Sequence, residues 1–133
     1  MVTASLVESD IEDGRKLLDE LKSIDSHFLV EAAFWLLRPE VLDWRLYIAT
    51  PLVDQRGSAS AYTDIQGALR ALARPSISMQ DISVVSPKDK LVKVIKRAIR
   101  IPNGANGVRL ARSRVDDTYV EGAYVYRVRN GRS

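Results

Sequence analysis

Residues 28–50, with the sequence FLVEAAFWLLRPEVLDWRLYIAT, decide the fold of this chain. Two runs rich in apolar and aromatic residues, 28–37 and 44–50, flank the polar stretch 38–43, which contains a proline. Short apolar runs on either side of such a turn signal are typical of a β-hairpin. We therefore expect two antiparallel strands here, connected by residues 38–43.

The two faces of this hairpin differ in polarity when residues alternate with the period of two of an unbulged strand. One face is apolar and is predicted to lie in the core: Val30, Ala32, Phe34, Leu36, Trp44, Leu46 and Ile48. The other face mixes aromatic, small and charged residues: Glu31, Ala33, Trp35, Leu37, Arg45, Tyr47 and Ala49. Because this second face is half apolar, we expect a helix of the chain, a second subunit or a partner to cover it.

The residues before the hairpin predict a helix over residues 9–24. Ser9 and Glu12 have the spacing of a capping box, in which each side chain satisfies a backbone donor at the helix start. One face of this helix carries the apolar side chains of Leu17, Leu18, Leu21 and Ile24. Gly14 costs the helix up to about 1 kcal/mol relative to alanine, so we expect a packing reason for it.

The residues after the hairpin predict a loop, a second helix and a short strand. Residues 54–57 are expected to form the loop, and residues 58–73 the helix. The buried stripe of this helix is predicted to contain Tyr62, Ile65, Leu69 and Leu72. Residues 82–85 then predict a strand that leads into a third helix.

The third helix has the clearest start signal. Ser86 can cap it, Pro87 takes the first-turn position, and Asp89 lies at the capping-box site. Its apolar face is predicted to carry Leu91, Val92, Ile95, Ala98 and Ile99.

The last part of the chain predicts a second hairpin. Strands over residues 108–115 and 119–128 are expected to turn at Asp116-Asp117, followed by a short basic tail at residues 129–133. The complete order is α-β-β-α-β-α-β-β. This order predicts an α+β fold with a mainly antiparallel sheet of about five strands and three helices packed against it.

Length and composition indicate a single domain over residues 1–133. A chain of 133 residues buries roughly two-thirds of the surface that its unfolded form exposes, which is enough for one core. The absence of cysteine excludes disulfides and thiolate zinc sites and suits a reducing cytoplasm. Residues 1–13 lack signal-peptide features, and no apolar run approaches the roughly 20 residues that span a bilayer. We therefore expect a soluble, cytoplasmic protein without membrane contact.

Charge is distributed unevenly along the chain. The formal net charge is +3, but residues 1–66 carry 12 acidic and 6 basic side chains, whereas residues 67–133 carry 5 acidic and 14 basic ones. Such asymmetry favours a polyanionic partner. The alternative is that the two halves pack together and partly neutralise each other.

Three segments resemble a group of predicted bacterial proteins without an assigned function: residues 32–36 (AAFWL), 44–54 (WRLYIATPLVD) and 82–87 (ISVVSP). The resemblance covers most of the chain, but these are strand and cap segments that carry no motif chemistry. It implies a bacterial origin and a stand-alone domain, and it implies no activity.

The sequence carries no recognisable catalytic or metal-binding motif. His27 is the single histidine, and no nucleophile-elbow sequence accompanies it. Asp116 and Asp117 suit a hairpin turn better than paired acid–base chemistry. Residues 102–107 (PNGANG) follow a helix and enter a strand, so they lack the helix N-terminus that a phosphate loop needs. No cofactor and no metal are therefore predicted.

The third predicted helix carries the first candidate site, a basic face. Its cations recur at i, i+3, i+4 and i+7: Lys93, Lys96, Arg97 and Arg100. Such a row can follow a nucleic-acid backbone. Three tyrosines of the last hairpin can add stacking surfaces: Tyr119, Tyr124 and Tyr126. The alternative is an ordinary solvated helix face.

The mixed face of the first hairpin is the second candidate site. Trp35 and Tyr47 beside Glu31 and Arg45 have the composition of a protein interface. If no helix covers this face, a second copy of the chain or a protein partner must bury it.

Three functions therefore stay open. The leading hypothesis is a non-enzymatic bacterial interaction module that forms a homodimer or binds a protein partner. The alternative is a nucleic-acid-associated accessory protein that uses the basic helix face. The third is a small enzyme with an unrecognised site, which would need His27, Asp54, Arg56 or a tyrosine to converge in a pocket.

Overall fold

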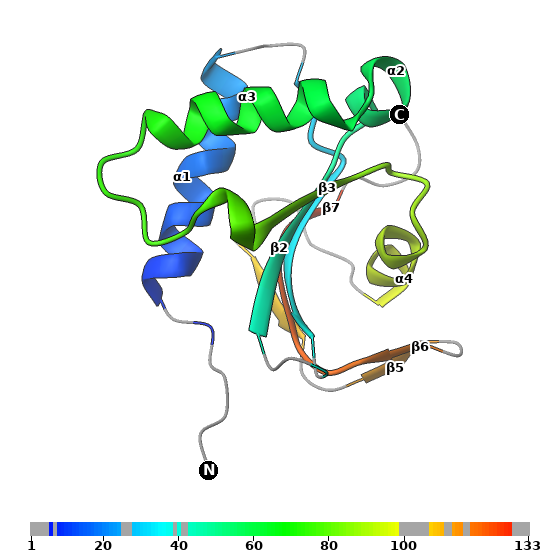
Figure 1. Cartoon of the computed structure of the whole chain (residues 1–133). Coiled ribbons are helices and arrows are strands. Elements are labelled where there is room, and N and C mark those ends of the chain that lie inside the picture. The colour runs from blue at the N-terminus through cyan, green and yellow to red at the C-terminus, as the bar shows by residue number, and fades with distance from the viewer. Residues whose placement is uncertain are drawn as a thin grey trace.

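The computed structural model describes most of the chain: residues 6, 8–24, 28–38, 40, 43–98, 107–110, 113–115 and 118–128. Helices cover both faces of one sheet in these residues (Figure 1). The helical elements are α1 (Glu8–Ile24), α2 (Leu52–Arg56), α3 (Ser58–Arg70), the 3-10 helix η1 (Met79–Asp81) and α4 (Lys90–Ala98). The strands are β1 (Ala32–Arg38), β2 (Asp43–Ala49), β3 (Ile82–Val85), β4 (Val108–Leu110), β5 (Ser113–Val115), β6 (Thr118–Val120) and β7 (Ala123–Val128).

Five of the strands form one sheet in the order β3-β2-β1-β7-β4. All neighbours are antiparallel except β2 and β3. These two strands run parallel because α2 and α3 carry the chain back to the starting edge before β3 begins. The predicted α+β class with a mainly antiparallel five-stranded sheet is confirmed. The remaining strands, β5 and β6, pair only with each other in the described residues.

The hairpin of β1 and β2 is confirmed, but the predicted division of its residues into two faces is wrong. Trp35 lies opposite Leu46, and Phe34 lies opposite Tyr47. Arg38 pairs with Asp43, so an even number of residues connects the strands. Even-numbered residues of β1 therefore share a face with odd-numbered residues of β2. The prediction had placed the even-numbered residues of both strands on the same face.

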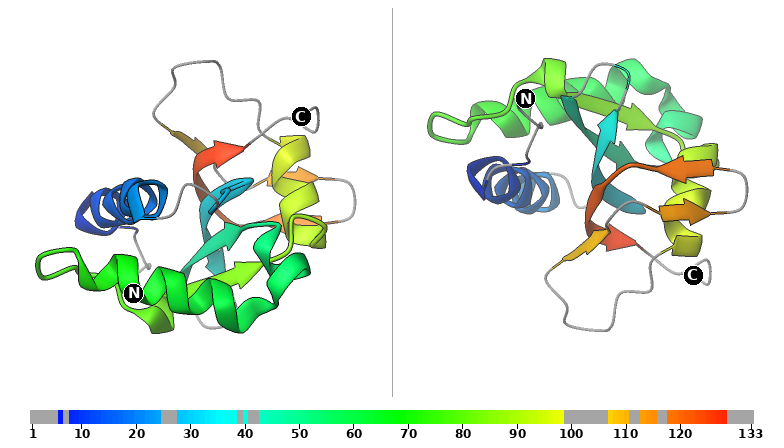
Figure 2. Two further views of the ribbon diagram at one scale, coloured as in Figure 1. Left: turned by 90° about the horizontal axis from the view of Figure 1, so that it is seen from above. Right: turned by 90° about the horizontal axis from the view of Figure 1, so that it is seen from below.

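Both faces of the sheet are buried. Helices α1 and α3 cover one face, where the buried side chains from the sheet are Ala33, Trp35, Leu46, Ile48, Ile82, Val84 and Tyr126. Helix α4 and the β5–β6 hairpin cover the other face, where they are Ala32, Phe34, Leu36, Ala49, Ala123 and Val125. Figure 2 shows α1 and α3 on one side of the sheet and α4 on the other. The residues predicted to share a half-apolar face are therefore covered by helices of the same chain on both sides of the sheet, Ala33 and Trp35 on one side and Tyr47 and Ala49 on the other.

The helices agree with the sequence in position. Helix α3 starts at Ser58 as predicted and ends at Arg70, before the predicted residue 73. Ser9 lies within α1, so the predicted capping box at Ser9 is wrong. Residues 54–57 were expected to form a loop, but α2 occupies most of them. This helix starts early because Pro51 already has helical backbone angles and Thr50 Oγ1 accepts the Leu52 N–H at 3.3 Å. None of the helices in the described residues is long and apolar enough to cross a bilayer.

The predicted second hairpin is divided between two sheets. Its end, β7, pairs with β1 and β4, whereas β6 pairs with β5 beside α4. The division falls at Gly122, whose carbonyl accepts the Leu37 N–H at 3.0 Å. A Cβ at this position would come within 3.3 Å of the Trp44 ring, so glycine permits this close approach.

Candidate nucleic-acid interface

Polar contacts fix the start of α4. Asp89 Oδ1 accepts the Leu91 N–H at 2.8 Å, so Asp89 caps the helix. The predicted cap, Ser86, has another role: its hydroxyl accepts the Lys88 N–H at 3.1 Å and donates to Asp54 Oδ2 at 2.8 Å. Ser86 therefore ties the turn before α4 to α2.

The apolar side of α4 is held between the sheet and the β5–β6 hairpin. Val92, Val94 and Ile95 are buried there. They belong to one cluster with Phe34 and Ala49 of the hairpin strands and with Val120 of β6. Because apolar side chains fix α4 on two sides, the remaining side of the helix is presented to solvent in a defined orientation.

The solvent side of α4 presents a row of three exposed cations, Lys90, Lys93 and Arg97, which we call the α4 line. Their spacing of three and four residues places them on one stripe of the helix. Lys93 and Arg97 belong to the basic face that the sequence predicted. The sequence prediction did not include Lys90, although residues three positions apart, such as Lys90 and Lys93, lie on the same side of a helix.

Lys96 points away from the α4 line. Its Nζ lies 3.9 Å from Glu31 Oε1, and the two side chains are only 25% and 21% exposed. The contact joins α4 to the residue before β1, so Lys96 is partly neutralised within the chain. The prediction that all four cations line one solvated face is therefore corrected for Lys96, and Arg100 lies outside the described residues.

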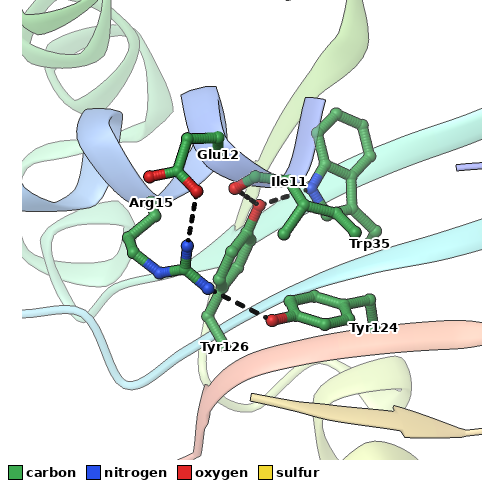
Figure 3. Close-up of polar contacts among 6 residues, drawn as sticks. All are labelled: Ile11, Glu12, Arg15, Trp35, Tyr124 and Tyr126. Atoms are coloured by element: carbon green, nitrogen blue, oxygen red, sulfur yellow. Dashed lines mark hydrogen bonds and ion pairs between the residues drawn. The ribbon is translucent and has the colours of Figure 1, made fainter. Parts of the chain in front are cut away.

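The four residues of the predicted protein interface do not share a surface. Trp35 lies on the α1 side of the sheet and is 2% exposed. Its Nε1 donates to the Tyr126 hydroxyl at 2.8 Å, and that hydroxyl donates to the Ile11 carbonyl at 2.6 Å (Figure 3). Trp35 is therefore a core residue and offers no ring to a partner.

The other three residues of that set make contacts within the chain. Tyr47 stacks on Phe34 with ring centroids 5.4 Å apart, and burial raises the pKa of its hydroxyl. Arg45 Nη1 donates to Ser83 Oγ at 2.9 Å, while Arg45 Nε is buried without a hydrogen-bond partner among the described residues. Glu31 faces α4, as described above. These contacts join β2 to β1 and β3, and the segment before β1 to α4.

Gly14 has the packing role that the sequence predicted. A Cβ at this position of α1 would overlap the Tyr126 hydroxyl. The absence of a side chain therefore lets α1 approach β7 closely enough for Tyr126 to reach the helix backbone.

The three tyrosines predicted as stacking surfaces differ in exposure. Tyr126 is buried, with 9% exposed. Tyr124 accepts a hydrogen bond from Arg15 Nη2 at 3.3 Å, and the Arg109 guanidinium lies 5.5 Å from its ring centroid (Figure 3 shows the Arg15 contact). Tyr119 is 55% exposed, so it is the one of the three that presents most of its surface to solvent.

The candidate catalytic residues do not gather in the described part of the chain. Asp54 accepts the Ser86 hydroxyl, and Arg56 is exposed at the end of α2. Among the described residues, no three side chains of metal-ligating type come together. Several predicted features lie outside the described residues: His27, Asp116-Asp117 and residues 102–106.

Comparison of this chain with protein-family models, with curated proteins and with solved structures gave no match. The resemblance to a bacterial group without an assigned function stays a prediction. We therefore infer function from the surface of this chain alone.

Proposed function

We propose that this chain is a nucleic-acid-associated accessory protein whose α4 line binds the sugar-phosphate backbone. The single observation that carries the proposal is the exposed row of Lys90, Lys93 and Arg97 on a helix that is fixed by its buried side. The backbone of this row is already fixed, so only the side chains lose freedom when the row meets a polyanion. Each phosphate that it neutralises releases condensed counterions, which drives binding at low salt.

The protein-interaction hypothesis loses its main motivation. It depended on a partly apolar sheet face that needed an external cover. Helices of the same chain cover both faces, α1 and α3 over Ala33 and Trp35, and α4 with the β5–β6 hairpin over Tyr47 and Ala49. Self-association through another surface stays a prediction. Oligomeric state is measured by analytical ultracentrifugation, and a monomer at high concentration would contradict the homodimer.

The proposal is tested by fluorescence anisotropy with labelled oligonucleotides of about 12 nucleotides, single-stranded and duplex. The α4 variant reverses all three cations of the α4 line to glutamate. The control variant reverses three exposed cations on the opposite side of the sheet, Lys16 and Lys22 of α1 and Arg70 of α3. Both variants lower the net charge equally, so any difference between them reports position.

We expect the unaltered protein to bind at about 50 mM salt, and the control variant to bind with reduced affinity. The affinity of the α4 variant should be at least about tenfold lower than that of the control variant. Equal loss in both variants would mean that net charge alone governs binding. No binding by the unaltered protein at low salt would contradict the proposed function itself.

A further inference from the structure

We infer that the β5–β6 hairpin stacks an unpaired base on Tyr119, and that the nucleic acid bound by this protein is single-stranded. The inference rests on the proposed function and adds the class of ligand to it. It is carried by the two faces of the hairpin, by the exposure of Tyr119 and by the position of α4.

The two faces of the hairpin are chemically distinct. Arg114 pairs directly with Tyr119, and Val115 pairs with Thr118. Val115 and Val120 pack in the cluster around α4, so their face of the hairpin is the inner one. Arg114 and Tyr119 alternate with them and therefore occupy the outer face. Both are exposed.

Tyr119 is unusually exposed for an aromatic side chain. It is 55% exposed, whereas the other large apolar side chain exposed in the described residues, Leu29, is 38% exposed. Arg114 lies directly opposite Tyr119 in the register of the hairpin, so a cation and an exposed ring occupy neighbouring positions on its outer face. An aromatic ring beside a cation is the combination with which proteins stack single-stranded bases and hold the adjoining phosphate.

The position of α4 favours a single strand over a duplex. Helix α4 lies on the inner side of the β5–β6 hairpin, and Tyr119 lies on the outer side (Figure 1 shows α4 and the hairpin). A ligand that contacts both the α4 line and Tyr119 must bend around the hairpin. Duplex DNA keeps its direction over roughly 150 base pairs and holds its bases inside the stack, so it cannot do this without large deformation. A flexible single strand can.

Charge near the hairpin indicates the path of the strand. Arg114 is exposed on β5, next to Tyr119, and attracts phosphate. We therefore expect the backbone to leave Tyr119 across β5 and to continue toward α4, which contacts β5.

The test uses the full chain with single-stranded DNA, single-stranded RNA and duplex DNA probes of about 12 nucleotides. The variants are Tyr119→Ala, Tyr119→Phe and the α4 variant. The altered ring is exposed, so we expect all Tyr119 variants to fold, and circular dichroism with urea denaturation checks this. Tyr119→Ala removes the ring on which one base stacks, so it should weaken single-strand binding about tenfold. Tyr119→Phe retains the ring and should retain the affinity. Neither substitution should change duplex binding.

Each outcome decides the inference. Preferential single-strand binding that Tyr119→Ala removes and Tyr119→Phe retains supports it, and the DNA and RNA probes then identify the preferred sugar. Unchanged single-strand binding by Tyr119→Ala, with loss in the α4 variant, would overturn the stacking inference and leave the proposed function intact. If no probe binds the unaltered protein at low salt, both are overturned.

Discussion

Tyr126 joins α1 to the sheet through a single hydroxyl. This hydroxyl accepts the Trp35 Nε1–H and donates to the Ile11 carbonyl, and it lies against the backbone of Gly14. The four residues come from α1, β1 and β7, and they are buried together. Because a buried donor without an acceptor costs free energy, a change at any of them affects the others.

Gly14 can be compared with Gly67, a second helical glycine. A Cβ at Gly14 would overlap the Tyr126 hydroxyl, whereas a Cβ at Gly67 of α3 meets nothing within 4 Å. We expect Gly14→Ala to lower the free energy of unfolding by about 1–3 kcal/mol, despite the higher helix propensity of alanine. Gly67→Ala should raise it by up to about 1 kcal/mol. Urea denaturation measures both, and stabilisation by Gly14→Ala would refute the contact.

Tyr126 also predicts a dependence of stability on pH. Burial raises the pKa of its hydroxyl above the usual value of about 10. Above about pH 10 the unfolded chain releases this proton first, so the free energy of unfolding falls as the pH rises. Tyr47 shifts in the same direction and contributes to the fall.

Tyr126→Phe separates this contribution from that of Tyr47. The substitution should cost about 1–3 kcal/mol at neutral pH, because it leaves the Trp35 Nε1–H without an acceptor. It should also reduce the loss of stability between about pH 8 and about pH 11. Urea denaturation at both pH values measures the difference, and an identical pH profile for the two proteins would contradict the role of Tyr126.

At the scale of single residues, the sequence is informative where the role of a residue depends on its neighbours in the chain. Gly14 was recognised because glycine is unfavourable within any helix. The contact between Trp35 and Tyr126 was not, because these residues are 91 positions apart and only the sheet order brings β7 beside β1.

At the scale of elements, periodicity located the helices and most strands, and it failed on register. The alternation of β1 and β2 is visible in the sequence, but their relative phase depends on which residues form the connection. One residue more or less would exchange the faces of β2. The predicted interface of Trp35 and Tyr47 depended on that phase. In the structure the two residues lie on opposite faces of the sheet.

The start of α4 gives a prediction at this scale. Asp89 caps the helix through the Leu91 N–H, so Asp89→Ala should lower the free energy of unfolding by about 1 kcal/mol. Asp89→Asn retains a side-chain oxygen acceptor and should cost much less. Urea denaturation of the two variants provides the comparison, and equal losses would indicate that the cap does not stabilise α4.

At the scale of the whole molecule, the charge asymmetry of the sequence becomes a spatial one. The acidic first half supplies α1 and α3 on one side of the sheet, and the basic second half supplies α4 on the other (Figure 2). The Glu31–Lys96 contact shows that some neutralisation between the halves occurs. The α4 line nevertheless stays exposed. Composition alone cannot distinguish neutralisation between the two halves from an exposed basic surface, because it does not say which side chains face inward.

Salt dependence is expected to reflect this surface. The three cations of the α4 line are expected to contribute a slope of about −2 for the logarithm of the association constant against the logarithm of salt concentration with a single strand. The α4 variant should lose this contribution and keep only the smaller slope of contacts outside the α4 line, such as that of Arg114. Anisotropy titrations between about 50 mM and about 200 mM salt measure the slope, and an unchanged slope in the variant would place the contacts elsewhere.

The most direct measurement is a titration of the ¹⁵N-labelled protein with a single-stranded oligonucleotide, followed by amide chemical shifts. The account predicts that shifts change in the α4 segment, residues 88–98, and in the β5–β6 hairpin, residues 113–120. Amides of α1 and α3, on the opposite side of the sheet, should stay unchanged. Shifts confined to α1 and α3, or no shifts at low salt, would contradict the claim that this protein binds nucleic acid through α4.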